Sequence, residues 1–466
     1  MNRDRVWVGD MGTAGAMDAT AIGEAVRKGE LSRADVIDGV RQRLEAAKVL
    51  NATVCADFDV ASKAHVAEGP FTAVPMFIKD LLHAKGFPTY HGSPGIPHRI
   101  EKKSDPVVKQ IESSGCVVVG KSTTSEFGFL PSTETVRHGA TLNPINIGYS
   151  TGGSSGGAAA LVAAGVVPIA HAMDGGGSIR IPANCCGLVG LKPTRSRHVV
   201  SPTAILPIDI VTNGIVSRTV RDTANYFAAI EKYRPKKNLP AIGHVQGPDK
   251  KRLRIAVFTQ NPAGLEAHPD VSRAVRESAA ACERLGHHVE YISTPFTDRV
   301  MFDFLVYYAF LSRMQLSTGR FTLHPAFKAS LTEPFTKGLA EFFTRSMLHA
   351  PGSFRRLKRI VNAEHDALMA KYDVALCPTL LNPVPKLGEY AGDVPFVSLI
   401  MRINNYVNYT ILQNITGAPA ISLPTGRCSN GLPIGPQFFT RQGGESTLLA
   451  LAFELEQSEA FQKWVA

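Results

Sequence analysis

The sequence of 466 residues predicts an α/β fold, on two observations. First, residues 252–292 contain an apolar run at 253–258, a helical segment that ends near Gly286, and a second apolar run at 289–292. Second, residues 158–172 are almost wholly apolar and mostly small, which is typical of a buried helix followed by a short strand. Strands that alternate with helices pair in parallel within a helix-covered sheet.

Capping and apolar periodicity place the other elements in order along the chain. Residues 18–48 predict two helices, the second of which begins at Ser32. The apolar run before Lys79 predicts a buried strand that ends at this lysine. Further strands are expected at 51–59, 116–119, 166–170, 374–377 and 420–423, and a C-terminal helix at 446–457.

Composition excludes several classes of protein. The chain is 44% hydrophobic and 19% charged, so it can bury a large core. Its net charge of +10 is scattered apart from one basic run at 355–359, so we expect a solvated helix face there and no nucleic-acid partner. The seven cysteines form no metal-ligand spacing, so we expect neither a metal nor a disulfide. A cytoplasmic protein without a membrane span is expected, because no long apolar run or signal-peptide core is seen.

Two glycine-framed serines flank the buried segment at 158–172. Ser154 lies in the motif G-G-S-S-G-G, and Ser178 follows Gly175, Gly176 and Gly177. Backbone N–H groups at both places can approach a ligand without obstruction by side chains. Such loops are usually flexible surface loops, but the buried connection holds these two serines in a fixed relation. A glycine run that ends in serine can supply both a nucleophile and an oxyanion hole.

Lys79 has two interpretations. Burying a lysine is costly, so on position alone its ammonium group would extend outward to solvent or to Asp80. Alternatively, burial lowers the pKa of the lysine and makes it a general base. We favour the second interpretation because both serine motifs follow downstream.

Together these motifs resemble the amidase signature family of serine hydrolases. That family carries G-G-S-S-G-G and then D-x-G-G-S-I-R-x-P, and this chain has both, with the two serines 24 positions apart. Residues 74–82 resemble the lysine element of the family. The resemblance implies one large domain over residues 1–466, with a mixed central β-sheet covered by helices on both faces and a signature catalytic core at 70–225. The motifs look most like those of 6-aminohexanoate-cyclic-dimer hydrolases and other xenobiotic amidases.

The family's roles, transferred by motif, make Ser178 the nucleophile, Ser154 a bridging serine on a cis peptide, and Lys79 the base. The resemblance also implies an oxyanion hole built from the backbone N–H groups of Gly175, Gly176, Gly177 and Ser178. We expect hydrolysis of bulky or apolar amides through an acyl-enzyme, with esters, anilides and carbamates as further candidate substrates. A small-molecule substrate, no cofactor, and a monomer or homodimer are expected.

Four positions bear on loop geometry and substrate. Asp174 and Arg180 are six residues apart and are expected to form a structural ion pair that braces the second serine loop. Many relatives have threonine where this chain has Gly175 and proline where it has Thr151. These departures leave small aliphatic amides in doubt as substrates.

Three alternative functions stay open. A glutamine-dependent amidotransferase subunit of a tRNA-modifying complex shares the motifs, but typically has glutamine where this chain has Ile181. Residues 115–122 match the phosphate-binding pattern G-x-x-x-x-G-K-[ST] through Lys121, although the β-branched residues within it favour a strand. The third alternative is a non-catalytic binding module.

Aromatic residues are concentrated in one segment of the chain. Residues 302–354 hold eleven of the 36 aromatic residues, which predicts a helical insertion at 300–356. A subdomain with an aromatic core is the simpler interpretation. A mobile lid over the active site, selecting a bulky substrate, is the alternative.

Overall fold

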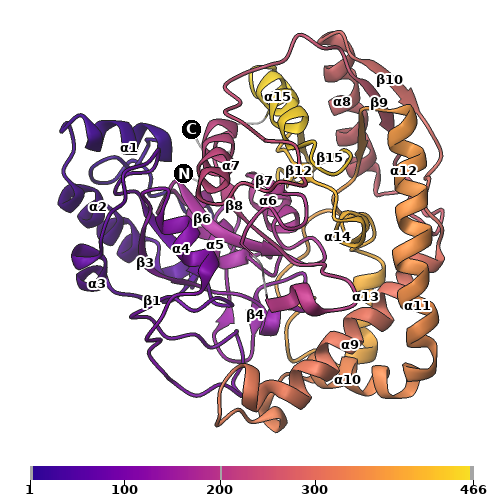
Figure 1. Ribbon diagram of the computed structural model, residues 1–466, viewed down its shortest axis with the longest axis horizontal. Helices are drawn as coiled ribbons and strands as arrows, with labels where there is room; N and C mark the ends of the chain where they lie inside the picture. Colours follow the sequence, from indigo (N-terminus) through magenta and orange to yellow (C-terminus); the bar gives the residue numbers. More distant parts are fainter. Residues whose placement is uncertain (1–3, 200–201, 462–466) are drawn as a thin grey trace.

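The computed structural model describes residues 4–199 and 202–461, which form a mixed α/β structure (Figure 1). Its main sheet, within these residues, has eight strands in the order β10 (His288–Tyr291), β9 (Arg254–Val257), β11 (Val374–Cys377), β15 (Gln437–Phe439), β12 (Ala420–Ser422), β7 (Val189–Lys192), β8 (Thr212–Ser217) and β6 (Ile169–Asp174). Pairing is parallel from β10 to β11 and antiparallel from there to β6. A smaller sheet has the order β1 (Thr53–Ala56), β3 (Val117–Ser122) and β2 (Pro75–Lys79).

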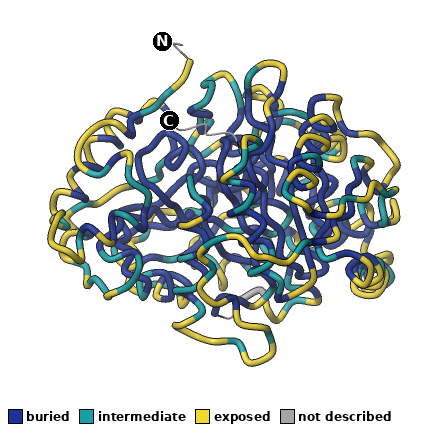
Figure 2. Tube along the Cα trace, turned by 90° about the horizontal axis from the view of Figure 1, so that it is seen from above, coloured by how far each residue is buried: buried dark blue, intermediate teal, exposed yellow. Residues whose placement is uncertain are grey.

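The main sheet is covered on both faces, as expected. Successive side chains of β11 enter two different apolar cores: Ala375 and Cys377 belong to one, Val374 and Leu376 to the other. One face carries α7 (Val220–Tyr233), α8 (Pro269–Arg284) and α15 (Glu445–Glu456), and the other carries α5 (Gly156–Ala163), α6 (Arg180–Cys186) and α14 (Ile411–Thr416). Figure 2 shows the resulting buried interior within a rim of exposed loops and helix faces.

Most of the predicted elements are confirmed. Helices α1 (Ala19–Arg27) and α2 (Arg33–Ala46) occupy residues 18–48, and Ser32 caps α2 by accepting a hydrogen bond from the Asp35 N–H. The predicted strand, helix and strand of 252–292 are β9, α8 and β10, and the two strands pair in parallel. The C-terminal helix is α15.

Several predicted strands differ in their limits, and for two of them the chain shows the reason. The strand expected at 51–59 ends at Ala56, because the Asp57 carboxylate accepts backbone hydrogen bonds that begin α3 (Phe58–Lys63). The strand expected at 166–170 begins only at Ile169, after a turn at Gly165, where φ is +81°. It then continues to Asp174, so β6 leads directly into the loop of the second serine.

The aromatic segment is helical. It comprises α9 (Arg299–Thr322), α10 (Pro334–Ser346) and α11 (Ala350–Arg356), and leads through a π-helical turn into α12 (Asn362–Lys371). The basic run at 355–359 is only partly a solvated face, because Arg356 pairs with the buried Asp303 and Leu357 is itself buried. Among the helices described, none combines the length and the apolar character needed to cross a bilayer.

Candidate active site

Lys79 ends strand β2 with its side chain directed into the protein. The residue is 1% exposed, and its Nζ lies 2.7 Å from Ser154 Oγ and 2.8 Å from Ser155 Oγ. The alternative in which its ammonium group extends outward to Asp80 is therefore wrong. Asp80 instead accepts hydrogen bonds from the Tyr90 N–H and from Lys121 Nζ.

The electrostatic setting of Lys79 favours a neutral amine. Burial lowers the pKa of its ammonium group to about 7, and the nearby Asp174 carboxylate acts in the opposite direction. At neutral pH, the Lys79 amine is therefore uncharged in a large fraction of the molecules. An uncharged amine that contacts a hydroxyl has the lone pair needed to accept its proton.

The first serine loop is fixed by close backbone contacts. The Gly153–Ser154 peptide bond is cis, and a Cβ atom at Gly153 would collide with the backbone of Ser132. Thr133 Oγ1 donates to the Gly152 carbonyl and accepts from the Gly156 N–H, where α5 begins. The serine is thus held between a tight turn and the start of a buried helix.

The second serine loop is built around the predicted ion pair, which is confirmed. Asp174 and Arg180 are fully buried, and Arg180 Nε lies 2.9 Å from Asp174 Oδ2. Asp174 also accepts hydrogen bonds from the Gly177 and Ile179 N–H groups and from Asn414 Nδ2. Burial alone would raise the pKa of this carboxyl, but the charge and hydrogen bonds of Arg180, together with Lys192 and Asn414, outweigh burial and lower the pKa to about 2. The carboxylate therefore stays ionised and holds the turn that presents Ser178.

The predicted oxyanion-hole donors are not equivalent. The N–H of Gly177 donates to Asp174 Oδ1 at 2.8 Å, so it is already engaged and not free to bind an oxyanion. Over residues 4–199 and 202–461, no protein acceptor is hydrogen-bonded to the N–H groups of Gly175, Gly176 or Ser178. Thr410 Oγ1 donates to the Gly176 carbonyl at 2.6 Å and fixes the orientation of that peptide.

Ser178 lines an apolar pocket. It is 8% exposed, and within the described chain no hydrogen bond joins its hydroxyl to that of Ser154. The pocket has about 600 Å³ of empty space, part of it open to solvent. Its walls come from the 129–131 segment, α9, α10, and the chain from α13 (Phe396–Asn404) to α14. No Asp, Glu, Lys or Arg among the described residues lines it. The polar side chains that line it are Ser178, Tyr308 and Asn404.

Three other buried basic groups lie near the site. His171 Nδ1 faces the Lys79 N–H at 3.3 Å and must accept from it, so His171 Nε2 carries the proton and donates to Asn213. Burial lowers the pKa of His171 to about 3, so it is neutral.

Lys121 lies in strand β3 and donates to the Leu82 carbonyl and to Thr89 Oγ1, so residues 115–122 form no phosphate loop. Lys192, which sequence reasoning missed, is also buried, and burial lowers its pKa to about 7.

Known proteins are similar in sequence to this chain over nearly its whole length. The Amidase family profile matches residues 34–449. The chain belongs to the amidase family. AmiC of Mycobacterium tuberculosis is 40% identical over 474 residues, covering 99% of this chain and 98% of the relative. The amidase-family chain is also 32% identical to the 6-aminohexanoate-cyclic-dimer hydrolase of Paenarthrobacter ureafaciens, over 96% and 95% of the two sequences.

The fold agrees with this assignment. A solved structure of 6-aminohexanoate cyclic dimer hydrolase complexed with substrate superposes with a TM-score of 0.83 at 29% identity, covering 95% of this chain and 97% of the other. Membership of the amidase family makes the protein a hydrolase of carbon–nitrogen bonds. The mixed α/β architecture, with its large mixed sheet and helices, is that of the family.

Proposed function

We propose that the protein hydrolyses amides with bulky or apolar acyl groups through an acyl-enzyme on Ser178, with Ser154 and Lys79 as the proton relay. The observation that carries the proposal is the 2.7 Å contact between a fully buried lysine amine and Ser154 Oγ. Burying a lysine is costly unless other interactions compensate, and a lowered pKa together with contact to a serine hydroxyl suits a general base.

The proposed reaction has two stages. Lys79 accepts a proton from Ser154, which takes one from Ser178 as the Ser178 oxygen attacks the carbonyl carbon. The same relay in reverse protonates the leaving nitrogen, and water then releases the acid from Ser178. The two serine hydroxyls must approach during this step, since catalytic hydrogen bonds often form only in the complex with substrate.

The developing oxyanion would be bound by the N–H groups of Gly175, Gly176 and Ser178. Each such donor supports about 3 kcal/mol of transition-state stabilisation in other hydrolases. Gly177 would act indirectly, because its N–H fixes the loop to Asp174.

The pocket supports the substrate class. Its apolar walls would bury an uncharged acyl chain or ring, and α9 and α10 of the 300–356 insertion would form its cover. Free glutamine fits poorly, because its charged amino and carboxylate groups would find no ion-pair partner there. Ile181, where amidotransferase subunits typically carry glutamine, is part of the apolar wall.

The test combines labelling with a substrate panel. An arylsulfonyl fluoride should form a covalent adduct that maps to Ser178, and Ser178→Ala should abolish both the adduct and turnover. The panel compares an anilide, an alkyl amide, an ester, a carbamate and glutamine. An adduct on another residue, or hydrolysis of glutamine alone, would contradict the proposal.

A further inference from the structure

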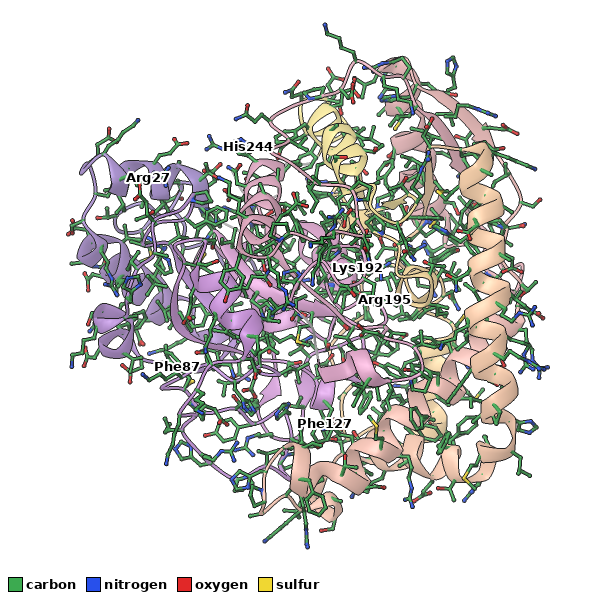
Figure 3. The ribbon with its side chains drawn as sticks, in the orientation of Figure 1. Arg27, Phe87, Phe127, Lys192, Arg195 and His244 are labelled. Atoms are coloured by element: carbon green, nitrogen blue, oxygen red, sulfur yellow. The ribbon has the colours of Figure 1, made fainter. Side chains whose placement is uncertain are left out.

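The helical insertion at 300–356 contacts one loop beside the active site and holds it in place. This loop, residues 126–129, follows strand β3 and carries Phe127, which Figure 3 labels beside the helices of the insertion. The Phe127 ring meets Phe327 of the insertion edge to face, with 6.2 Å between centroids. Because Phe127 has a φ of +51°, which side chains other than glycine rarely adopt, the surroundings must hold the loop in this conformation.

Hydrogen bonds from the insertion also hold this loop in place. Glu126 Oε2 accepts hydrogen bonds from the Glu333 N–H at 2.8 Å and from Thr336 Oγ1 at 2.5 Å, both at the start of α10. On α9, the Tyr308 hydroxyl donates to the Gly128 carbonyl at 3.0 Å. The position of the 126–129 loop is therefore set by α9 and α10.

The other side of the same loop touches the first serine. A Cβ atom at Gly128 would lie 3.3 Å from Ser154 Oγ, so the Gly128 backbone forms one wall around that hydroxyl. A shift of this peptide by a few tenths of an ångström would change the space in which the Ser154 hydroxyl is held against Lys79.

Tyr308 is at the same time a wall of the substrate pocket. Its ring stacks on Phe304 at 5.4 Å and meets Phe129 edge to face at 5.2 Å. An acyl group in the pocket would thus contact the ring whose hydroxyl holds the Gly128 carbonyl.

We infer that Tyr308 is a positioning residue that couples occupancy of the acyl pocket to the placement of Ser154, through its hydrogen bond to Gly128. This inference rests on the proposed function. Filling the pocket would press the Tyr308 ring into place and align the relay, so acyl groups that fill the pocket would react faster as well as bind more tightly.

The test uses Tyr308→Phe, which keeps the ring and removes only the hydroxyl. The neighbouring Tyr307→Phe is the matched control, because the Tyr307 hydroxyl also bonds a backbone carbonyl, that of Ile208, but touches neither the pocket nor the loop. Both variants and the wild type are assayed on hexanoyl and acetyl anilides, with active sites titrated by the sulfonyl fluoride. We expect Tyr308→Phe to lower kcat per active site about tenfold on the hexanoyl anilide, with KM within about twofold. Its kcat preference for hexanoyl over acetyl should disappear.

The outcomes separate the two proposals. Equal kcat values for Tyr308→Phe and wild type, or an equal loss in Tyr307→Phe, would overturn the coupling while leaving the Ser178 mechanism intact. A wild type that hydrolyses no amide and takes no adduct on Ser178 would overturn the proposed function itself. Should Tyr308→Phe fold poorly, Thr336→Val weakens the same loop from α10 and should lower kcat in the same direction.

Discussion

The Nζ atom of Lys79 lies 2.7 Å from the Oγ atom of Ser154, although 75 positions separate the two residues in the chain. The lysine belongs to the small sheet, whereas both serine loops adjoin β6 of the main sheet. The contact therefore depends on how the two sheets pack, with His171 of β6 accepting a hydrogen bond from the backbone N–H of Lys79.

Replacing this lysine tests the relay directly. Lys79→Met keeps an unbranched, buried side chain but removes the base, so kcat/KM for an anilide should fall about 10³-fold, within the range for loss of a general base. Thermal unfolding of the variant should remain cooperative, because no charge loses a partner. A variant that retains a tenth or more of wild-type kcat/KM would exclude Lys79 as the base.

The pH dependence of the rate follows from the lowered pKa of Lys79. The amine is protonated and inactive below about pH 7 and free above it. We expect kcat/KM to rise with pH through a midpoint near 7 and then level off, measured on an uncharged anilide from pH 5.5 to 9. A rate that is flat over this range would show that a different group limits proton transfer.

The brace of the second serine loop should control stability. Arg180→Met leaves Asp174 buried and unpaired, so we expect a loss of about 3–5 kcal/mol in the free energy of unfolding, measured with urea. The control is Arg221→Met, which removes an ion pair with Asp18 in which the arginine is half-exposed and should cost about 1 kcal/mol or less. The pKa of Asp174 lies below that in the unfolded chain, so its contribution is full above about pH 4 and is lost as the pH falls towards 2. Equal losses in the two variants would argue against the brace.

Glu333 should make stability fall as the pH rises. Burial, aided by repulsion from Glu126, raises the pKa of Glu333 to about 8, and its Oε2 atom has no hydrogen-bond partner among the described residues. The folded state binds the proton more tightly than the unfolded state, so stability is lost between about pH 4.5 and 8. Glu333→Gln should remove this loss. At pH 9 the free energy of unfolding of this variant should exceed that of wild type by at least about 1 kcal/mol. Glu341→Gln, at an exposed site on the same helix, should not change the pH profile.

The pocket should discriminate by charge. Hexanoyl, 6-aminohexanoyl and 5-carboxypentanoyl anilides have similar chain lengths and differ mainly in the charge at the far end. Because no ionised side chain among the described residues lines the pocket, we expect kcat/KM to fall at least about 100-fold for both charged substrates. Comparable rates on all three would place the acyl group outside this pocket.

Sequence reasoning could find the site where chemistry is local and could not where it depends on packing. The two glycine-framed serines and Lys79 each lie in a short motif of consecutive residues, and apolar runs predict the strands around them. The engagement of Gly177 with Asp174 is a three-residue turn that glycine content alone does not reveal. Asn414 and Tyr308 reach the site from distant segments. Ser155 belongs to the first serine motif, but that motif does not reveal that its hydroxyl also contacts Lys79. Likewise, Lys192 has no local signal, because its burial results from the assembled sheet.

The division of the site between two sheets has a consequence for heat inactivation. Separation of the small sheet from β6 would withdraw the amine from the hydroxyl while the main sheet and its helices stayed intact. Turnover would then vanish on warming before far-UV circular dichroism registers melting, and it would return on cooling.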